Sequence, residues 1–85
     1  MLKTLGPEHP SIAGTYGSIG SAYHFKGEQD KAIEYHEKSF AIKLKTFGPG
    51  HPSVGTSYNN IGLVYCSKGE HDKAIGSYDK SLAIM

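Results

Sequence analysis

The chain has 85 residues, a net charge of +1 and 38% hydrophobic residues, which suits one small globular domain and leaves no room for a second. All nine basic residues are lysines and none of them forms a basic block, which argues against binding to nucleic acid. The sequence shows neither an apolar run long enough for a membrane span nor a signal-peptide pattern, and a single cysteine excludes an internal disulfide. We therefore expect a cytoplasmic protein that binds neither nucleic acid nor membrane.

The sequence consists of one unit written twice, with an offset of 42 residues. When residues 1–43 are laid over residues 43–85, 23 of the 43 positions are identical. The loop Gly6–Ser11 recurs as Gly48–Ser53 with one change. We interpret this as a duplicated structural unit.

The first segment of each unit has the period of an α-helix. At about 100° per residue, one face of this segment gathers five residues, which are Ile12, Tyr16, Ile19, Gly20 and Tyr23. The residues 42 positions later form the same face. A proline suits the first turn of each helix, and Gly27 and Gly69 suit the position after the last turn. These helices are predicted at residues 10–26 and 52–68.

A second helix is predicted at residues 29–46 and again at 71–85. Acidic side chains near its start are favourable at the positive end of a helix. Ile33 belongs to one apolar stripe, whereas Tyr35 and Ile42 lie about 180° away from it. A helix with two apolar faces packs between neighbours, so we expect contact with its own partner helix and with the next hairpin. The alternative is that Tyr35 and Ile42 are simply exposed.

The whole chain is thus predicted to be one all-α domain of two helical hairpins, over about residues 6–47 and 48–85. The first helix of each hairpin matches the pattern aromatic-x-x-Leu-Gly-x-x-Tyr, with isoleucine for leucine, at Tyr16–Tyr23 and Tyr58–Tyr65. This pattern resembles the tetratricopeptide repeat, and the 42-residue period and the Gly-Pro-x-His-Pro loop resemble its kinesin-light-chain type. The resemblance implies an α–α superhelix of stacked hairpins.

The sequence carries no motif of a catalytic or metal-binding site. None of the five histidines has the spacing to another ligand that is typical of zinc, so we expect no metal and no cofactor. His36 is interpreted as a hydrogen-bonded packing residue. Cys66, with no base close to it in the sequence, is interpreted as a small packing residue. An enzyme is not expected.

The face of the first helix opposite its tyrosines differs between the two units. The resemblance implies that this helix lines a concave groove that takes an extended peptide or a partner's helix, and that Asn60 stands where many family members bind the ligand backbone. The candidate groove residues are Ser18, Ser21, Phe25, Thr56, Asn59, Asn60, Leu63 and Ser67. The alternatives are that the asparagines are merely solvated and that Phe25 packs against a neighbouring repeat.

These patterns predict a non-catalytic scaffold that binds a protein or peptide partner through the groove. The alternative is a structural self-assembling unit, built by stacking or hairpin exchange, with no peptide ligand. Repeats of this kind are usually stable in sets of three or more. We therefore expect the chain to be part of a longer array or to form a homo-oligomer.

Overall fold

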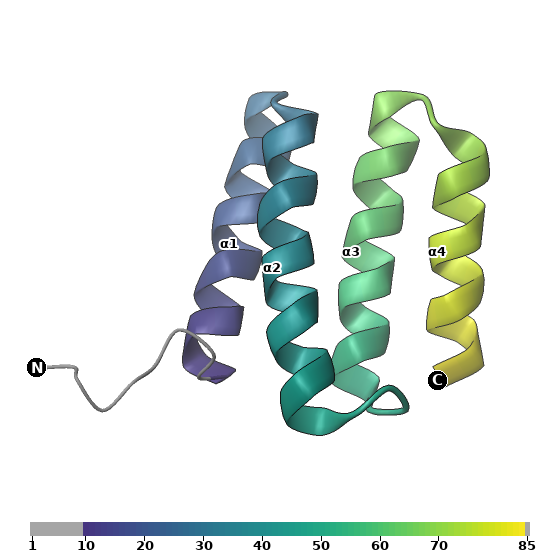
Figure 1. Cartoon of the computed structure of the whole chain (residues 1–85). Helices are drawn as coiled ribbons and strands as arrows, with labels where there is room; N and C mark the ends of the chain where they lie inside the picture. Colours follow the sequence, from purple (N-terminus) through teal and green to yellow (C-terminus); the bar gives the residue numbers. More distant parts are fainter. Residues whose placement is uncertain (1–9, 85) are drawn as a thin grey trace, which may run out of the picture.

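The structure is a computed structural model that describes residues 10–84 (Figure 1). It contains four helices in this part of the chain, which are α1 (Pro10–Lys26), α2 (Gln29–Phe47), α3 (Pro52–Lys68) and α4 (His71–Ile84). No strand occurs between residues 10 and 84, and the predicted all-α fold class is confirmed. The loop expected at residues 6–9 and the residue Met85 lie outside the described residues.

The ends of the helices follow from a few local residues. Gly27 and Gly69 have φ angles of 91° and 89°, a left-handed conformation that glycine adopts without strain, so both helix-ending predictions are confirmed. At the start of α3, the Nδ1 atom of His51 accepts a hydrogen bond of 3.0 Å from the backbone N–H of Ser53. This bond satisfies one of the free N–H groups of the first turn.

The helices pack in chain order, as Figure 1 shows. We call α1 with α2 repeat one, and α3 with α4 repeat two. Helix α2 packs against both α1 and α3, whereas α1 and α3 make a slight direct contact at most. The expected position of α2 between two neighbours is therefore confirmed. Helices α1 and α3 run in the same direction, and α2 and α4 run opposite to them.

Within each repeat, a glycine of the first helix lies against a ring of the second. A Cβ atom added at Gly20 would lie 2.9 Å from the ring of His36, and one added at Gly62 would lie 2.9 Å from the ring of Tyr78. These distances are shorter than van der Waals contact. The two helices of each hairpin can approach this closely because both positions lack a side chain.

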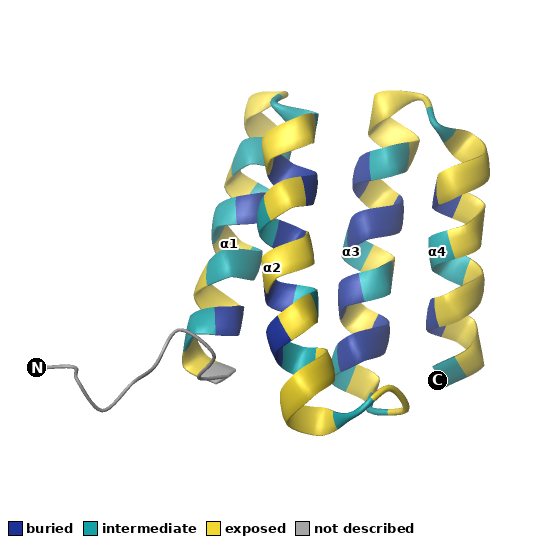
Figure 2. Ribbon diagram, in the orientation of Figure 1, coloured by how far each residue is buried: buried dark blue, intermediate teal, exposed yellow. Residues whose placement is uncertain are grey.

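The two repeats meet along α2 and α3. Ala32 and Ile33 of α2 form a buried cluster with Val64 of α3, and the ring of Phe40 lies 4.9 Å from that of Tyr58 between centroids. Figure 2 shows the buried residues concentrated along the sides where helices face one another. Burial of this apolar surface is what joins the hairpins.

Within residues 10–84, helix α4 packs mainly against α3, on one side. Its Ile75 is 56% exposed and its Leu82 is 74% exposed, whereas the corresponding Ile33 of α2 is 9% exposed under α3. Equivalent residues thus differ in burial because of their place in the row of helices. The α4 surface is yellow in much of Figure 2 for this reason.

Candidate functional site

The eight residues predicted to line a groove all lie on α1 and α3 and all reach the surface. Ser21 and Asn60 are half-buried. The other six are exposed, and they are Ser18, Phe25, Thr56, Asn59, Leu63 and Ser67. The structure places three of them on α1 and five on α3, so that they form two sets on two helices that run in the same direction.

The apolar members of this surface are exposed. Phe25 is 85% exposed, and its ring has the ring of His24 on its own helix as a neighbour, at 5.5 Å between centroids. The alternative that Phe25 packs against a neighbouring repeat does not hold within residues 10–84. Leu63 on α3 is 48% exposed. Both side chains are therefore accessible to a partner.

The polar members of the surface carry no charge. Asn59 and Asn60 each offer an amide, which can donate and accept hydrogen bonds with a peptide group. The hydroxyl of Thr56 donates to the carbonyl of Pro52 at 3.3 Å, one turn earlier in α3. What this face offers a ligand is thus neutral hydrogen bonding beside two apolar side chains.

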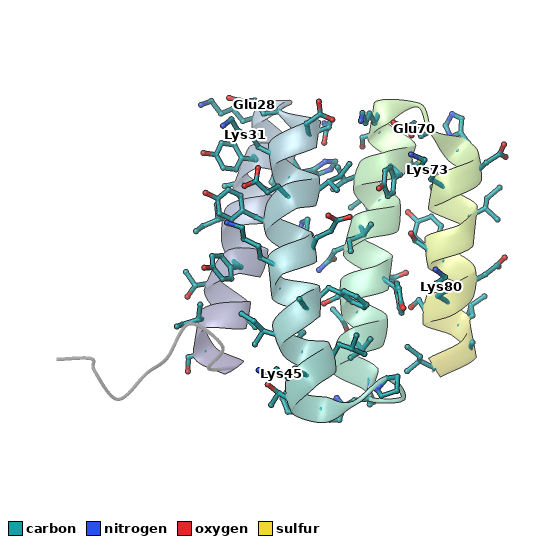
Figure 3. All side chains as sticks on the ribbon, in the orientation of Figure 1. Glu28, Lys31, Lys45, Glu70, Lys73 and Lys80 are labelled. Atoms are coloured by element: carbon teal, nitrogen blue, oxygen red, sulfur yellow. The ribbon has the colours of Figure 1, made fainter. Side chains whose placement is uncertain are left out.

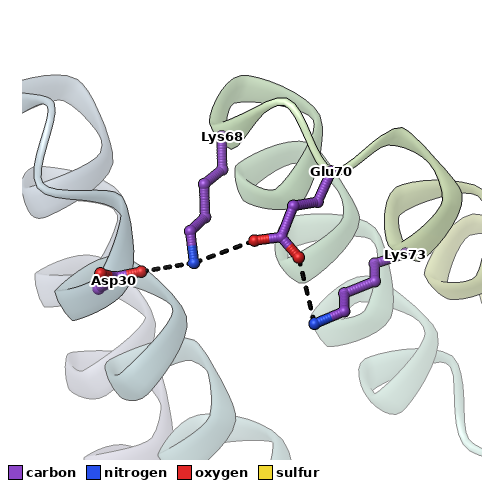
Figure 4. A network of polar contacts seen from close by, with 4 residues as sticks. All are labelled: Asp30, Lys68, Glu70 and Lys73. Carbon is purple, nitrogen blue, oxygen red and sulfur yellow. Dashed lines mark ion pairs between the residues drawn. The ribbon is translucent and has the colours of Figure 1, made fainter.

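The lysine nearest to this surface on α3 is held in an ion-pair network. Figure 4 shows the Nζ atom of Lys68 between Asp30, at 2.7 Å, and Glu70, at 3.1 Å, with Lys73 on the far side of Glu70. Hydrogen bonds to Asp30 and then Glu70 raise the pKa of Lys68, and hydrogen bonds from Lys68 and then Lys73 lower the pKa of Glu70. Because Asp30 belongs to α2, the network joins the two repeats.

The other side of α3 borders a cleft that the sequence did not indicate. We call it the tyrosine cleft. It has a volume of about 480 Å³ and is lined by Glu37, Phe40, Tyr58, Ile61, Tyr65, Lys73, Gly76, Ser77 and Lys80. Figure 3 shows Lys73 and Lys80 along α4 on the side toward α3. At about 100° per residue, Tyr58 lies about 160° from Asn60 on α3, so the cleft and the predicted groove use opposite sides of that helix.

Two other residues singled out in the sequence behave differently from each other. His36 is buried, and burial, followed by the charges of His24 and Lys43, lowers its pKa. Cys66 is exposed, so its interpretation as a packing residue was wrong. Its Sγ atom lies 3.9 Å from Nδ1 of His71, because the left-handed turn at Gly69 brings the start of α4 back beside the end of α3.

The described residues were also compared with the requirements of a metal site and of a membrane span. Residues 10–84 contain no group of three or more histidine, cysteine, aspartate or glutamate side chains placed to hold a metal ion. Within the same residues, no helix combines the length and the apolar character needed to cross a lipid bilayer.

Comparison with protein families agrees with the packing of the hairpins. Two models, both described as tetratricopeptide repeat, match the chain over residues 30–85 and 13–46. The first of them alone covers more than half of the chain. The chain belongs to the tetratricopeptide repeat family. A comparison with curated proteins found no significant match. Tetratricopeptide repeats generally mediate protein–protein interactions and are generally non-catalytic, which makes the exposed faces of this repeat pair the surfaces of interest.

Proposed function

We propose that this repeat pair is a non-catalytic interaction module that binds an extended peptide of a partner along the outward faces of α1 and α3. The observation that carries the proposal is the pair Asn59 and Asn60, which stand at the surface of α3 beside the exposed Leu63. We further propose that the repeats are of the kinesin-light-chain-like type, on the ground of their 42-residue period and their loop.

The chemistry of this face favours a largely neutral ligand. The asparagine amides match the donors and acceptors of an extended backbone, and Phe25 and Leu63 offer apolar contact. Lys68 is engaged with two carboxylates and is therefore a poor partner for a ligand carboxylate. We expect dissociation constants on the order of 10 μM, since two adaptable hydrogen-bonding side chains and two anchors form a small interface.

The test begins with selection of peptides from a random 12-residue display library on the immobilised chain. Affinities of the selected peptides are then measured by calorimetry for the wild type and for the double variant N59A/N60A. We expect binding to weaken about tenfold, because each lost hydrogen bond contributes about 0.5–1.5 kcal/mol.

The matched control is Asp79→Ala, which changes an exposed residue of α4 and should leave affinity unchanged. Circular dichroism checks that the helices remain in both variants. Equal affinity of the selected peptides for wild type and N59A/N60A would contradict the proposed surface.

Self-assembly is a second candidate, because Ile75 and Leu82 leave an apolar strip of α4 uncovered. In the chain itself, the corresponding strip of α2 is covered by α3. If a second copy covers α4 in the same way, light scattering at tens of micromolar will give a mass above the 9.2 kDa of one chain, and the mass will rise with concentration. A constant 9.2 kDa would exclude this candidate.

A further inference from the structure

Repeat one fills the space beside its two first-helix tyrosines with a third ring. The ring centroid of Tyr35 lies 6.0 Å from that of Tyr16 and 5.6 Å from that of Tyr23. The Nζ atom of Lys31 lies 5.8 Å from the centroid of Tyr23, and that of Lys38 lies 5.6 Å from the centroid of Tyr16. These three rings and two ammonium groups thus pack together in one cluster.

Repeat two keeps the frame of this arrangement and lacks its central ring. Lys73 lies 5.5 Å from the centroid of Tyr65, and Lys80 lies 5.7 Å from the centroid of Tyr58, as their counterparts do in repeat one. The position of the central ring is held by Ser77. A serine side chain is too short to reach between two tyrosine rings as a third ring does.

The missing ring coincides with the tyrosine cleft. Helix α2 closes the cleft on the side away from α4, with Phe40 4.9 Å from Tyr58 between ring centroids and with Glu37 beside it. A Cβ atom added at Gly76, on the α4 wall, would meet nothing within 4 Å. The cleft is therefore an open space between three helices, and its aromatic walls come from α2 and α3.

The charges at the edge of the tyrosine cleft indicate which charged group could bind next to an aromatic ring in it. In repeat one, Lys38 lies 3.8 Å from the carboxylate of Glu34, which precedes the central ring in the chain. The corresponding residue before Ser77 is Gly76, so Lys80 has no carboxylate four residues before it. Repeat two thus lacks both members of the acidic–aromatic pair that repeat one carries in its own sequence.

We propose that the tyrosine cleft binds an aromatic side chain of a partner protein, with an adjacent carboxylate of the partner beside Lys80. The internal copy shows the geometry that such a ring satisfies, because Tyr35 contacts the equivalent pair of tyrosines in repeat one, Tyr16 and Tyr23. The site lies on the side of α3 opposite to Asn60, and Asn59 lies about 100° from Tyr58 around the helix. It is independent of the peptide surface proposed above and stands if that surface fails.

The probe is the peptide acetyl-Gly-Glu-Tyr-Gly-Gly-amide, titrated into the ¹⁵N-labelled chain and followed by the NMR amide signals of Gly76 and Ser77. We expect saturable shifts at these two amides, with a dissociation constant on the order of 1 mM. The same peptide with alanine in place of tyrosine should give no saturable shift, because the ring supplies most of the contact.

The substitution Ser77→Tyr fills the cleft from inside the chain. We expect this variant to bind the probe at least tenfold more weakly and to melt about 5 °C higher, because the added ring regains the contacts of repeat one. Ser77→Ala, the matched control, keeps the cleft open and should bind as the wild type does. N59A/N60A should also bind as the wild type does.

A further variant keeps the proposal testable if Ser77→Tyr does not fold. Lys80→Ala should weaken binding of the glutamate probe about threefold and leave a glutamine version of the probe unaffected. Probe binding by Ser77→Tyr equal to that of the wild type would overturn the proposal. Shifts of Gly76 and Ser77 that grow with protein concentration and without the probe would also overturn it, because they would show a second copy in the cleft.

Discussion

The two repeats have the same arrangement of helices but carry their large aromatic side chains at different positions of the second helix. In repeat one, the ring against the glycine is the smaller one of His36, and Tyr35 adds a large ring outside it. In repeat two, Tyr78 takes the inner position and Ser77 the outer one. The comparison teaches that the hairpin tolerates this exchange, and that its consequence falls on the surface, where a cleft opens.

A second difference is that the second helix of repeat one is covered by the next hairpin, whereas the second helix of repeat two is not covered within residues 10–84. Ile33 is buried under α3, whereas Ile75, its counterpart, is more than half exposed. The same side chain thus contributes to the core in one repeat and to the surface in the other. In arrays of stacked hairpins, burial depends on the neighbour as much as on the residue.

The largest effect is expected where a glycine meets a ring. We expect Gly20→Ala to lower the free energy of unfolding by about 2 kcal/mol, because the new Cβ atom forces the buried ring of His36 to move. Gly62→Ala should cost less, because the ring that has to move, that of Tyr78, is only half-buried. Urea unfolding measures both values.

Gly14→Ala is the matched control for this comparison. A Cβ atom at Gly14 would meet nothing within 4 Å, so this change should raise the free energy of unfolding by about 0.5–1 kcal/mol through helix propensity alone. If all three alanine variants were stabilised alike, the close approach of the helices would not be a feature of the folded chain.

The next largest effect is expected in the pH dependence of stability, because repeat one has a buried histidine, His36, where repeat two has Tyr78. Burial lowers the pKa of His36 from its ordinary 6.5, with the positive charges of His24 and Lys43 adding to the effect. The unfolded chain therefore binds the proton more readily, so this contribution to stability is complete above pH 6.5 and is lost as the pH falls toward the lowered pKa.

The variant H36Y gives repeat one the inner residue of repeat two. The melting temperature of the wild type should fall between pH 7.5 and pH 5.5, and the fall should be smaller in H36Y. The same fall in both proteins would show that His36 is not the group that responds. The melting temperature at each pH is read by circular dichroism.

The smallest effect is expected for the ion pair between the repeats. Asp30→Asn removes one of the two carboxylates that hold Lys68. Because these groups are at the surface, we expect a slight fall in the melting temperature at low salt, and none in ~1 M NaCl, where such pairs are screened. A fall of the same size at both salt concentrations would rule out the electrostatic explanation.

The helices and their order of packing could be predicted because they follow from periodic patterns in the sequence. The 42-residue repeat, the helix-ending glycines and the two-sided α2 all follow from spacing along the chain. Gly20 also stands among large residues on its helix face, and a glycine in such a place favours close packing of two helices. These features need no knowledge of how distant side chains meet.

The features that the sequence did not predict depend on distances between helices. The tyrosine cleft arises because the small side chain of Ser77 leaves a volume empty. A missing ring cannot be recognised in the sequence until the structure shows where its counterpart, Tyr35, packs. The pair of Lys68 and Asp30 needs the end of α3 to lie beside the start of α2. Cys66 was misread because the exposure of its side chain depends on how the helices are placed around the end of α3.

The central claim is that the repeats share a packed frame and bind a partner where their exposed first-helix faces differ. NMR titration of the ¹⁵N-labelled chain with a peptide selected from the random library tests this claim most directly. We expect the largest amide shifts at Asn59, Asn60 and Leu63 on α3 and at Ser21 and Phe25 on α1. Shifts confined to α2 and α4 would contradict the proposed peptide surface on α1 and α3.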